Sequence, residues 1–161
     1  MERTGALSDT GAAVPQERTD WRREPTRVLV VDDDPGQRML CAVSLQREGL
    51  TVLEAEDGLR ALELARAERP DLILTDVMMP AFDGFQLAEA LRRDDRTSEI
   101  PLIFLSGEAT PGNGTRAREL GAVAYVRKPF DPPALASLVE GALTRAGTWT
   151  PGAGSLGSPV A

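Results

Sequence analysis

Four short apolar runs limit the folds open to this chain more than any other feature of its sequence. They cover residues 28–31, 72–75, 102–105 and 122–126. Each run has the length of a strand and is short for a buried helix, and none alternates between apolar and polar residues. Strands of this kind are typical of parallel sheets whose two faces are both covered by helices.

Helical patterns separate the runs and complete the alternation. We expect helices over residues 35–48, 58–67, 84–93 and 132–146, a short helix from about Thr115, and a further strand over residues 51–54. Strand and helix then alternate five times. This order predicts an α/β fold, namely a doubly wound five-stranded parallel sheet with helices on both faces.

Apolar spacing predicts which side of each helix is buried. In the first helix, Leu40 and Val43 stand three positions apart and are expected to face the core. In the second helix, Leu59, Leu62 and Ala65 form the corresponding stripe.

Length and composition indicate one domain with two tails. The chain has 161 residues, of which 42% are hydrophobic, enough for one core. Residues 1–25 and 147–161 lack hydrophobic periodicity and are predicted to be disordered. The folded domain is therefore expected at residues 26–146.

Charge and cysteine content exclude several classes of function. A net charge of −7 leaves no basic patch for nucleic acid or an anionic membrane surface. The single cysteine, Cys41, cannot form an internal disulfide and is expected to be a small buried hydrophobe. No apolar run reaches the roughly 18 residues of a membrane span. A cytoplasmic protein is the expectation.

Polar residues stand where the predicted strands end. Asp32 and Asp33 follow the first run, Asp76 the second, and Ser106 the third, while Lys128 follows the last. The carboxyl ends of parallel strands meet at one edge of the sheet, where sites form near the reversal of strand order. We therefore expect acids, a hydroxyl and an ammonium in one crevice.

Lys128 is the only lysine beside seventeen arginines. A compact ammonium on a slim stem suits a tight site for one anionic group, although a solvated surface lysine is the alternative. Asp34, followed by Pro35, is best explained as a helix N-cap. Asp32 and Asp33 could also be a solvated capping run, but paired carboxylates at a buried strand end repel each other without a cation.

Five phrases in order resemble the receiver domain of two-component response regulators. The resemblance spans about residues 26–146. It rests on the acidic run at 32–34, the segment 71–80, the Asp83-Gly84 turn, the segment 105–107 and the segment 125–130.

The resemblance implies a phosphoryl-accepting site that depends on Mg²⁺. Asp76 would be the phosphoacceptor, supplied by a sensor histidine kinase or a phosphotransfer protein. Asp33, Asp76 and the backbone carbonyl of Met78 would bind the ion directly, and Asp32 would hold it through water. We expect the side chains of Met78 and Met79 to be core filler.

The resemblance also implies a switch. Lys128 would pair with Asp76 and later with a phosphoryl oxygen, and the peptide bond before Pro129 would be cis. The Ser106 hydroxyl would bind the phosphoryl group, and Tyr125 would then change rotamer. Alternatively, Ser106 is a serine satisfied in a turn and Tyr125 a half-buried aromatic. Gly107 stands where alanine is more usual in the family.

The chain has no histidine, so its donor is expected to be another protein or a small acyl phosphate. The few residues after the last helix predict a stand-alone receiver, not an enzyme. It would signal to an unknown downstream protein through its fourth helix, fifth strand and fifth helix, with a phosphorylation-dependent homodimer possible. Alternatives are a phosphorelay intermediate, a degenerate receiver acting as a scaffold, and an aspartyl-nucleophile phosphohydrolase, which prefers Thr or Val where Gly36 stands.

Overall fold

The computed structural model describes residues 26–107 and 111–145. Within these residues the chain forms one five-stranded parallel sheet with the strand order β2-β1-β3-β4-β5. The strands are β1 (Arg27–Val31), β2 (Thr51–Ala55), β3 (Leu72–Asp76), β4 (Leu102–Ser106) and β5 (Ala124–Arg127). The predicted α/β fold class is confirmed. The expected tails, residues 1–25 and 147–161, lie outside the described residues.

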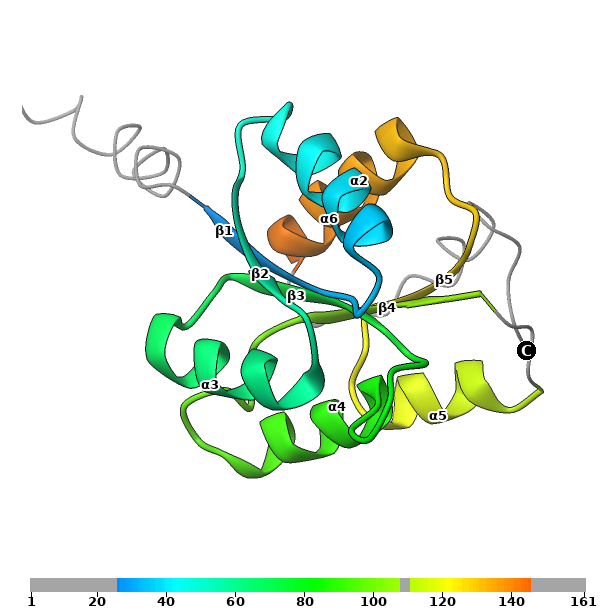
Figure 1. Cartoon of the computed structure of the whole chain (residues 1–161). Coiled ribbons are helices and arrows are strands. Elements are labelled where there is room, and N and C mark those ends of the chain that lie inside the picture. Colours follow the sequence, from blue (N-terminus) through cyan, green and yellow to red (C-terminus); the bar gives the residue numbers. More distant parts are fainter. Residues whose placement is uncertain (1–25, 108–110, 146–161) are drawn as a thin grey trace, which may run out of the picture.

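Helices connect the strands and cover both faces of the sheet. They are α2 (Pro35–Gln46), α3 (Gly58–Glu68), α4 (Gly84–Arg93), α5 (Asn113–Glu119) and α6 (Pro132–Arg145). Figure 1 shows α2 and α6 above the sheet and α3, α4 and α5 below it. Each face has its own hydrophobic core, in which strand residues alternate between the two sides. β3 and β4 are buried along their whole length, as their uniformly apolar sequences predict.

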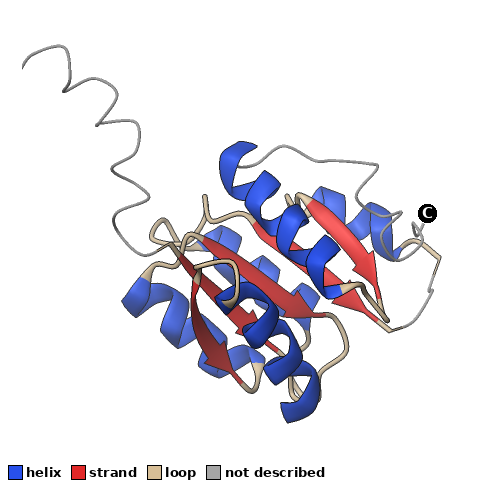
Figure 2. Ribbon diagram, turned by 90° about the horizontal axis from the view of Figure 1, so that it is seen from above, coloured by secondary structure: helices blue, strands red, loops and turns tan. Residues whose placement is uncertain are grey.

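The strand order creates the position for a site. β1 pairs with β2 on one side and with β3 on the other, so the chain leaves β1 and β3 toward opposite faces of the sheet. Figure 2, viewed from above, shows the strands running in one direction with helices on either side. In open α/β sheets, sites form at the carboxyl ends of the strands where the order reverses, which here are the ends of β1 and β3.

The prediction for the buried stripe of α2 was wrong. Leu40 and Val43 are 44% and 42% exposed, whereas Cys41 and Leu45 are fully buried against the sheet. Two apolar residues three positions apart do not determine which face of a helix is buried, because a neighbouring small residue can pack against the sheet in their place. Cys41 does so here, which confirms its predicted role as a buried hydrophobe.

The stripe of α3 was partly wrong. Leu59 is 61% exposed, while Ala65 is buried and Leu62 is half-buried. Two alanines on this helix let it approach the sheet closely, and Leu59 in its first turn is left outside. The short helix α5 begins at Asn113 instead of Thr115.

Gly84 begins α4 in a place with no room for a side chain. A Cβ at this position would overlap the backbone of Asp76 and contact Val77 at 3.0 Å, and the Gly84 amide donates to the Val77 carbonyl at 2.9 Å. The first residue of α4 is therefore packed against the end of β3.

We expect Gly84→Ala to lower the free energy of unfolding by about 1–3 kcal/mol, because two backbone segments must separate to admit the methyl group. Urea unfolding of the full chain measures the change. Gly107→Ala is the matched control, since a Cβ there meets nothing within 4 Å and should change stability by less than about 0.5 kcal/mol. Equal effects of the two substitutions would contradict the close approach at Gly84.

Candidate functional site: an acidic cluster at the carboxyl edge of the sheet

The acidic run is held between the end of β1 and the start of α2. The Asp32 amide continues the sheet by donating to the Ala55 carbonyl at 3.2 Å. Asp34 has extended dihedral angles and caps α2, because its carboxylate accepts the Gly36 amide at 2.9 Å. This confirms the predicted N-cap. Asp32 and Asp33 are therefore fixed at the carboxyl edge of the sheet.

The structure brings Asp76 to the same place. Val31 pairs with Thr75 in the register of β1 and β3, so the residues that follow them lie side by side. Carboxylate oxygens of Asp32, Asp33 and Asp76 lie within 4.8 Å of one another. Asp32 and Asp76 are buried, and Asp33 is exposed.

Lys128 completes the cluster from the other side. Its Nζ lies 3.2 Å from Asp32 Oδ2 and 3.4 Å from Asp76 Oδ1. The Lys128 amide donates to the Ser106 carbonyl at 2.7 Å, which extends the pairing of β4 and β5 to this residue. The peptide bond between Lys128 and Pro129 is cis, as expected.

The two neighbouring acids have different surroundings. Both oxygens of Asp32 are occupied, one by the Asp34 amide at 2.9 Å and the other by Lys128. Among the described residues, the Asp33 carboxylate accepts no hydrogen bond and forms no ion pair. Asp33 therefore has oxygens available for a ligand, whereas Asp32 is committed to protein contacts.

Burial and neighbouring charges shift the pKa values of Asp76 and Lys128. Burial, opposed by Lys128 and reinforced by Asp32, raises the pKa of Asp76 from its ordinary value of 3.8 to about 6. Burial also lowers the pKa of Lys128, but the carboxylates of Asp76 and Asp32 outweigh it, and the net pKa is raised. Lys128 therefore carries its charge at neutral pH, and Asp76 is mostly ionised there.

Ser106 and Tyr125 lie on the neighbouring strands. Ser106 is the last residue of β4 and is fully buried, one position beyond Leu105, which pairs with Asp76. Tyr125 in β5 is 3% exposed, not half-buried, and its ring centroid lies 6.4 Å from that of Phe104. Within the part of the chain that the structure describes, the buried Tyr125 hydroxyl has no hydrogen-bond partner.

The prediction for the methionine side chains was half wrong. Met79 is buried at 7% exposure, but the Met78 side chain is 57% exposed. Val77 and Met79 are both buried and Met78 between them is exposed, so consecutive side chains point to opposite sides of the chain.

The residues present fit a hard divalent cation. The carboxylate oxygens are of the kind that Mg²⁺ prefers, and the cluster gathers three of these groups. Three carboxylates and one ammonium leave two negative charges when all four groups are ionised. A divalent cation would balance that charge, and the exposure of Asp33 leaves room for the waters that Mg²⁺ keeps.

Sequence reasoning missed Arg38, a basic residue of α2 that contacts the backbone of the acidic run. Its Nη1 donates to the Asp32 carbonyl at 2.7 Å, and its Nε donates to Glu54 Oε1 at 3.1 Å. The only available signal was an arginine one helical turn after the N-cap Asp34. That pattern also fits an ordinary surface arginine.

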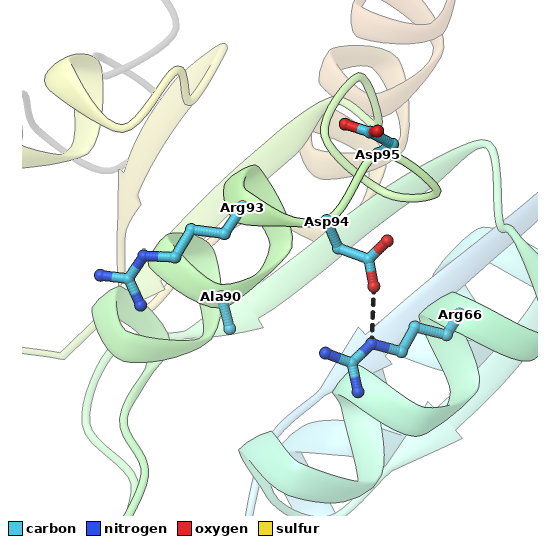
Figure 3. A pocket seen from close by; sticks show the side chains of 5 residues that line it. All are labelled: Arg66, Ala90, Arg93, Asp94 and Asp95. Carbon is cyan, nitrogen blue, oxygen red and sulfur yellow. Dashed lines mark hydrogen bonds and ion pairs between the residues drawn. The ribbon is translucent and has the colours of Figure 1, made fainter.

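A hollow lies away from the acidic cluster, near the ends of α3 and α4. It is lined by Arg66, Ala90, Arg93, Asp94 and Asp95, from the ends of α3 and α4 and the following loop (Figure 3). Arg66 Nε lies 2.8 Å from Asp94 Oδ2, and Arg96 also pairs with this acid. The hollow contributes no group to the acidic cluster.

Comparison with known proteins gives one family. A family model described as the response regulator receiver domain matches residues 28–140. The chain is 38% identical over 120 residues to the phosphate regulon transcriptional regulatory protein PhoB of Pseudomonas aeruginosa, covering 74% of this chain and 52% of PhoB. It is 35% identical over 117 residues to protein PilH of the same species, covering 73% of this chain and 97% of PilH.

Another relative is the DNA-binding dual master transcriptional regulator RpaA of Synechocystis. The two are 37% identical over 119 residues, which cover 74% of this chain and 49% of RpaA. The chain thus spans about half the length of the first curated relatives that it matches.

Solved structures show the same architecture. The chemotaxis protein CheY4 of Vibrio cholerae matches with a TM-score of 0.68 and 33% identity, covering 72% of this chain and 97% of that structure. A putative response regulator from Chloroflexus aurantiacus matches with a TM-score of 0.72 and 30% identity, covering 76% and 100%.

We expect Asp76→Asn to stabilise the metal-free protein at pH 7.5 by on the order of 1–3 kcal/mol. The folded-state pKa of about 6 lies above 3.8, so proton binding to Asp76 favours the native state. This contribution is fully present below about pH 4 and is lost as the pH rises through 6. Asparagine, which cannot ionise, removes the penalty.

Thermal melting in EDTA at pH 7.5 and pH 5 measures this effect. The gain from Asp76→Asn should shrink at the lower pH, while Asp95→Asn, at an exposed acid, should change the melting temperature little at either pH. A lower melting temperature for Asp76→Asn at pH 7.5 would show that the ionised Asp76 carboxylate does not destabilise the native state.

Proposed function

We propose that this chain, which belongs to the response regulator receiver domain family, accepts a phosphoryl group on the carboxylate of Asp76. The surroundings of that carboxylate carry the proposal. One Asp76 oxygen contacts the Lys128 ammonium at 3.4 Å, and two further acids lie within 4.8 Å. Asp32 shares the lysine, but both of its oxygens accept hydrogen bonds from the protein. Asp76 is thus the better nucleophile.

The proposed reaction is attack of an Asp76 oxygen on the phosphorus of a phosphohistidine. A P–O bond forms as the P–N bond breaks, and the imidazole nitrogen keeps the electron pair and takes a proton from solvent. An acyl phosphate on Asp76 results, as in other covalent catalysis by carboxylates. The protein mainly positions the groups and neutralises charge on the phosphoryl oxygens, and the Lys128 ammonium lies within reach of that charge.

Mg²⁺ is the proposed cofactor of the site. When bound, it would supply positive charge to the transferred phosphoryl group. Asp33, Asp76 and the Met78 backbone carbonyl are the proposed direct ligands. Asp32 is assigned a contact through water because its own oxygens are occupied. The exposure of Asp33 supports this division of roles.

The proposed donor is a sensor histidine kinase or a phosphotransfer protein. Receiver domains of response regulators interact with such proteins, and the donor imidazole has to come from outside these 161 residues, which contain no histidine. We further propose a downstream protein, or a second copy of the chain, that binds the phosphorylated form.

In the part of the chain that the structure describes, no helix is long and apolar enough to cross a bilayer.

A phosphohydrolase or a relay intermediate is less well supported. The family match and the relatives are those of response regulators. We therefore propose a switch that accepts one group and loses it slowly, not an enzyme that turns over. Release of many equivalents of phosphate per chain would contradict this.

We expect acetyl phosphate with Mg²⁺ to add one phosphoryl group per chain, at Asp76, because this carboxylate faces both Lys128 and the other acids. Intact mass spectrometry measures the addition. Asp76→Asn should abolish it, and Asp95→Asn should leave it unchanged. Undiminished labelling of Asp76→Asn would overturn the assignment.

Ser106 and Tyr125 are the proposed switch. Ser106 is buried beside the strand position that pairs with Asp76, and the Tyr125 ring lies on the next strand with its hydroxyl unpaired among the described residues. A phosphoryl group that drew the Ser106 hydroxyl toward it would move the end of β4. Tyr125 could then change rotamer without breaking a hydrogen bond to a described residue.

We expect Ser106→Ala to accept the phosphoryl group at Asp76 but to signal poorly, because the contact that distinguishes the two states is gone. Amide exchange over residues 106–130, with and without beryllofluoride, measures the response. An alanine variant that responds as the parent does would show that Ser106 is not the sensor.

A further inference from the structure

Arg38 makes two contacts that join separate parts of the molecule. Its guanidinium donates through Nη1 to the Asp32 carbonyl at 2.7 Å and through Nε to Glu54 Oε1 at 3.1 Å. Arg38 comes from α2 and Glu54 from β2, and the Arg38 side chain is only 18% exposed. It is thus held in one place and directed at the backbone of the acidic run.

The acceptor of Arg38 is the peptide oxygen immediately before Asp33. The Asp32 carbonyl and the Asp33 amide belong to one planar group, so fixing the oxygen fixes the plane from which Asp33 departs. The other contacts of Asp32 are made by its own amide and carboxylate, on the other side of its Cα. Among the described residues, Arg38 alone bonds to this carbonyl.

The Asp33 side chain adds no restraint of its own, so the two peptide groups on either side of Asp33 are what hold it, the following one through the Asp34 amide, which donates to Asp32 Oδ1 at 2.9 Å. The Asp33 side chain is exposed and forms no hydrogen bond or ion pair within residues 26–107 and 111–145. The position of its carboxylate therefore depends on the backbone that carries it. The Asp34 cap fixes that backbone on the far side, and Arg38 fixes it on the near side.

The Glu54 partner makes this role one of position more than of charge. The guanidinium and the Glu54 carboxylate form an ion pair, so together they add no net charge next to the cluster. Arginine suits the position because its rigid planar fork offers donors in two directions, whereas lysine has a single ammonium on a flexible stem.

We propose that Arg38 is a positioning residue for the metal ligand Asp33: by holding the Asp32–Asp33 peptide group, it keeps the Asp33 carboxylate directed at the cluster. This inference rests on the proposed function, because it concerns the Mg²⁺ site of that function. Arg38 would contact neither the ion nor the phosphoryl group.

The first test is Mg²⁺ affinity, measured by titration calorimetry on the full chain well below its melting temperature. We expect Arg38→Met to weaken Mg²⁺ binding by about tenfold or more, as is typical when a residue that orients a ligand is lost. Arg38→Lys should recover only part of the affinity. Arg60→Met is the matched control, because Arg60 forms an exposed pair with Glu63 at 3.2 Å on α3; its affinity should stay within about twofold.

A second readout needs no metal. In EDTA, Arg38→Met should speed hydrogen exchange of the Asp34 amide, which donates to Asp32 Oδ1, and Arg60→Met should not. At saturating Mg²⁺, Arg38→Met should recover most of the parent rate of labelling by acetyl phosphate, since the ligand is displaced and not removed. If Arg38→Met does not fold, Arg38→Lys carries the comparison.

Two failures can be told apart. If the parent chain binds Mg²⁺ and both Arg38 variants bind it as tightly, the positioning role is overturned and the proposed function stands. If the parent chain binds no Mg²⁺, the metal site of the proposed function fails and the inference falls with it.

Discussion

The Lys128 ammonium lies between two buried carboxylates, and the site at the carboxyl edge of the sheet depends on this contact. Asp32 and Asp76 are 3.2 and 3.4 Å from the ammonium. Burial makes the Asp76 carboxylate costly to ionise, and the pKa of Asp76 is raised to about 6 even with the lysine present. The site therefore has a net negative charge when its carboxylates are ionised. A cation, or a phosphoryl group together with its cation, can balance that charge.

The parallel sheet is what allows such a concentration of charge. Its strands contribute residues to two hydrophobic cores, one on each face, and those cores hold the ends of β1, β3, β4 and β5 at one edge. The residues that directly follow these strands therefore lie together at that edge. Gly84, without a side chain, lets α4 begin directly against the last residue of β3.

The fold and the location of the site could be predicted from the sequence because both follow from the ends of strands. The apolar runs mark the strands, so Asp32, Asp76 and Lys128 were expected at one edge, and the structure places them there. Contacts decided by packing could not be read in this way. Leu40 and Val43 have helical spacing but face outward, because Cys41 and Leu45 occupy the core side of α2.

The exposure of Met78 and the backbone contact of Arg38 could not be predicted from the sequence either. Met78 and Met79 are adjacent residues of the same type, yet the first side chain is exposed and the second is buried, which no apolar pattern indicates. Arg38 contacts a peptide oxygen, an acceptor that every residue carries and that no sequence letter distinguishes. The roles of Asp76, Asp33, Ser106 and Tyr125 remain proposals about chemistry that the arrangement supports.

The contact between Lys128 and Asp32 joins residues 96 positions apart in the sequence. Ribosomes add about 5–20 residues per second, so the acidic run is made roughly 5–20 s before its lysine. During that interval a nascent chain carries the carboxylates without the ammonium. The charge balance of the site is therefore completed only when β5 joins the edge of the sheet. A chain that ends before β5 therefore has the acidic cluster without the Lys128 ammonium. The site needs the last strand of the sheet for its charge balance.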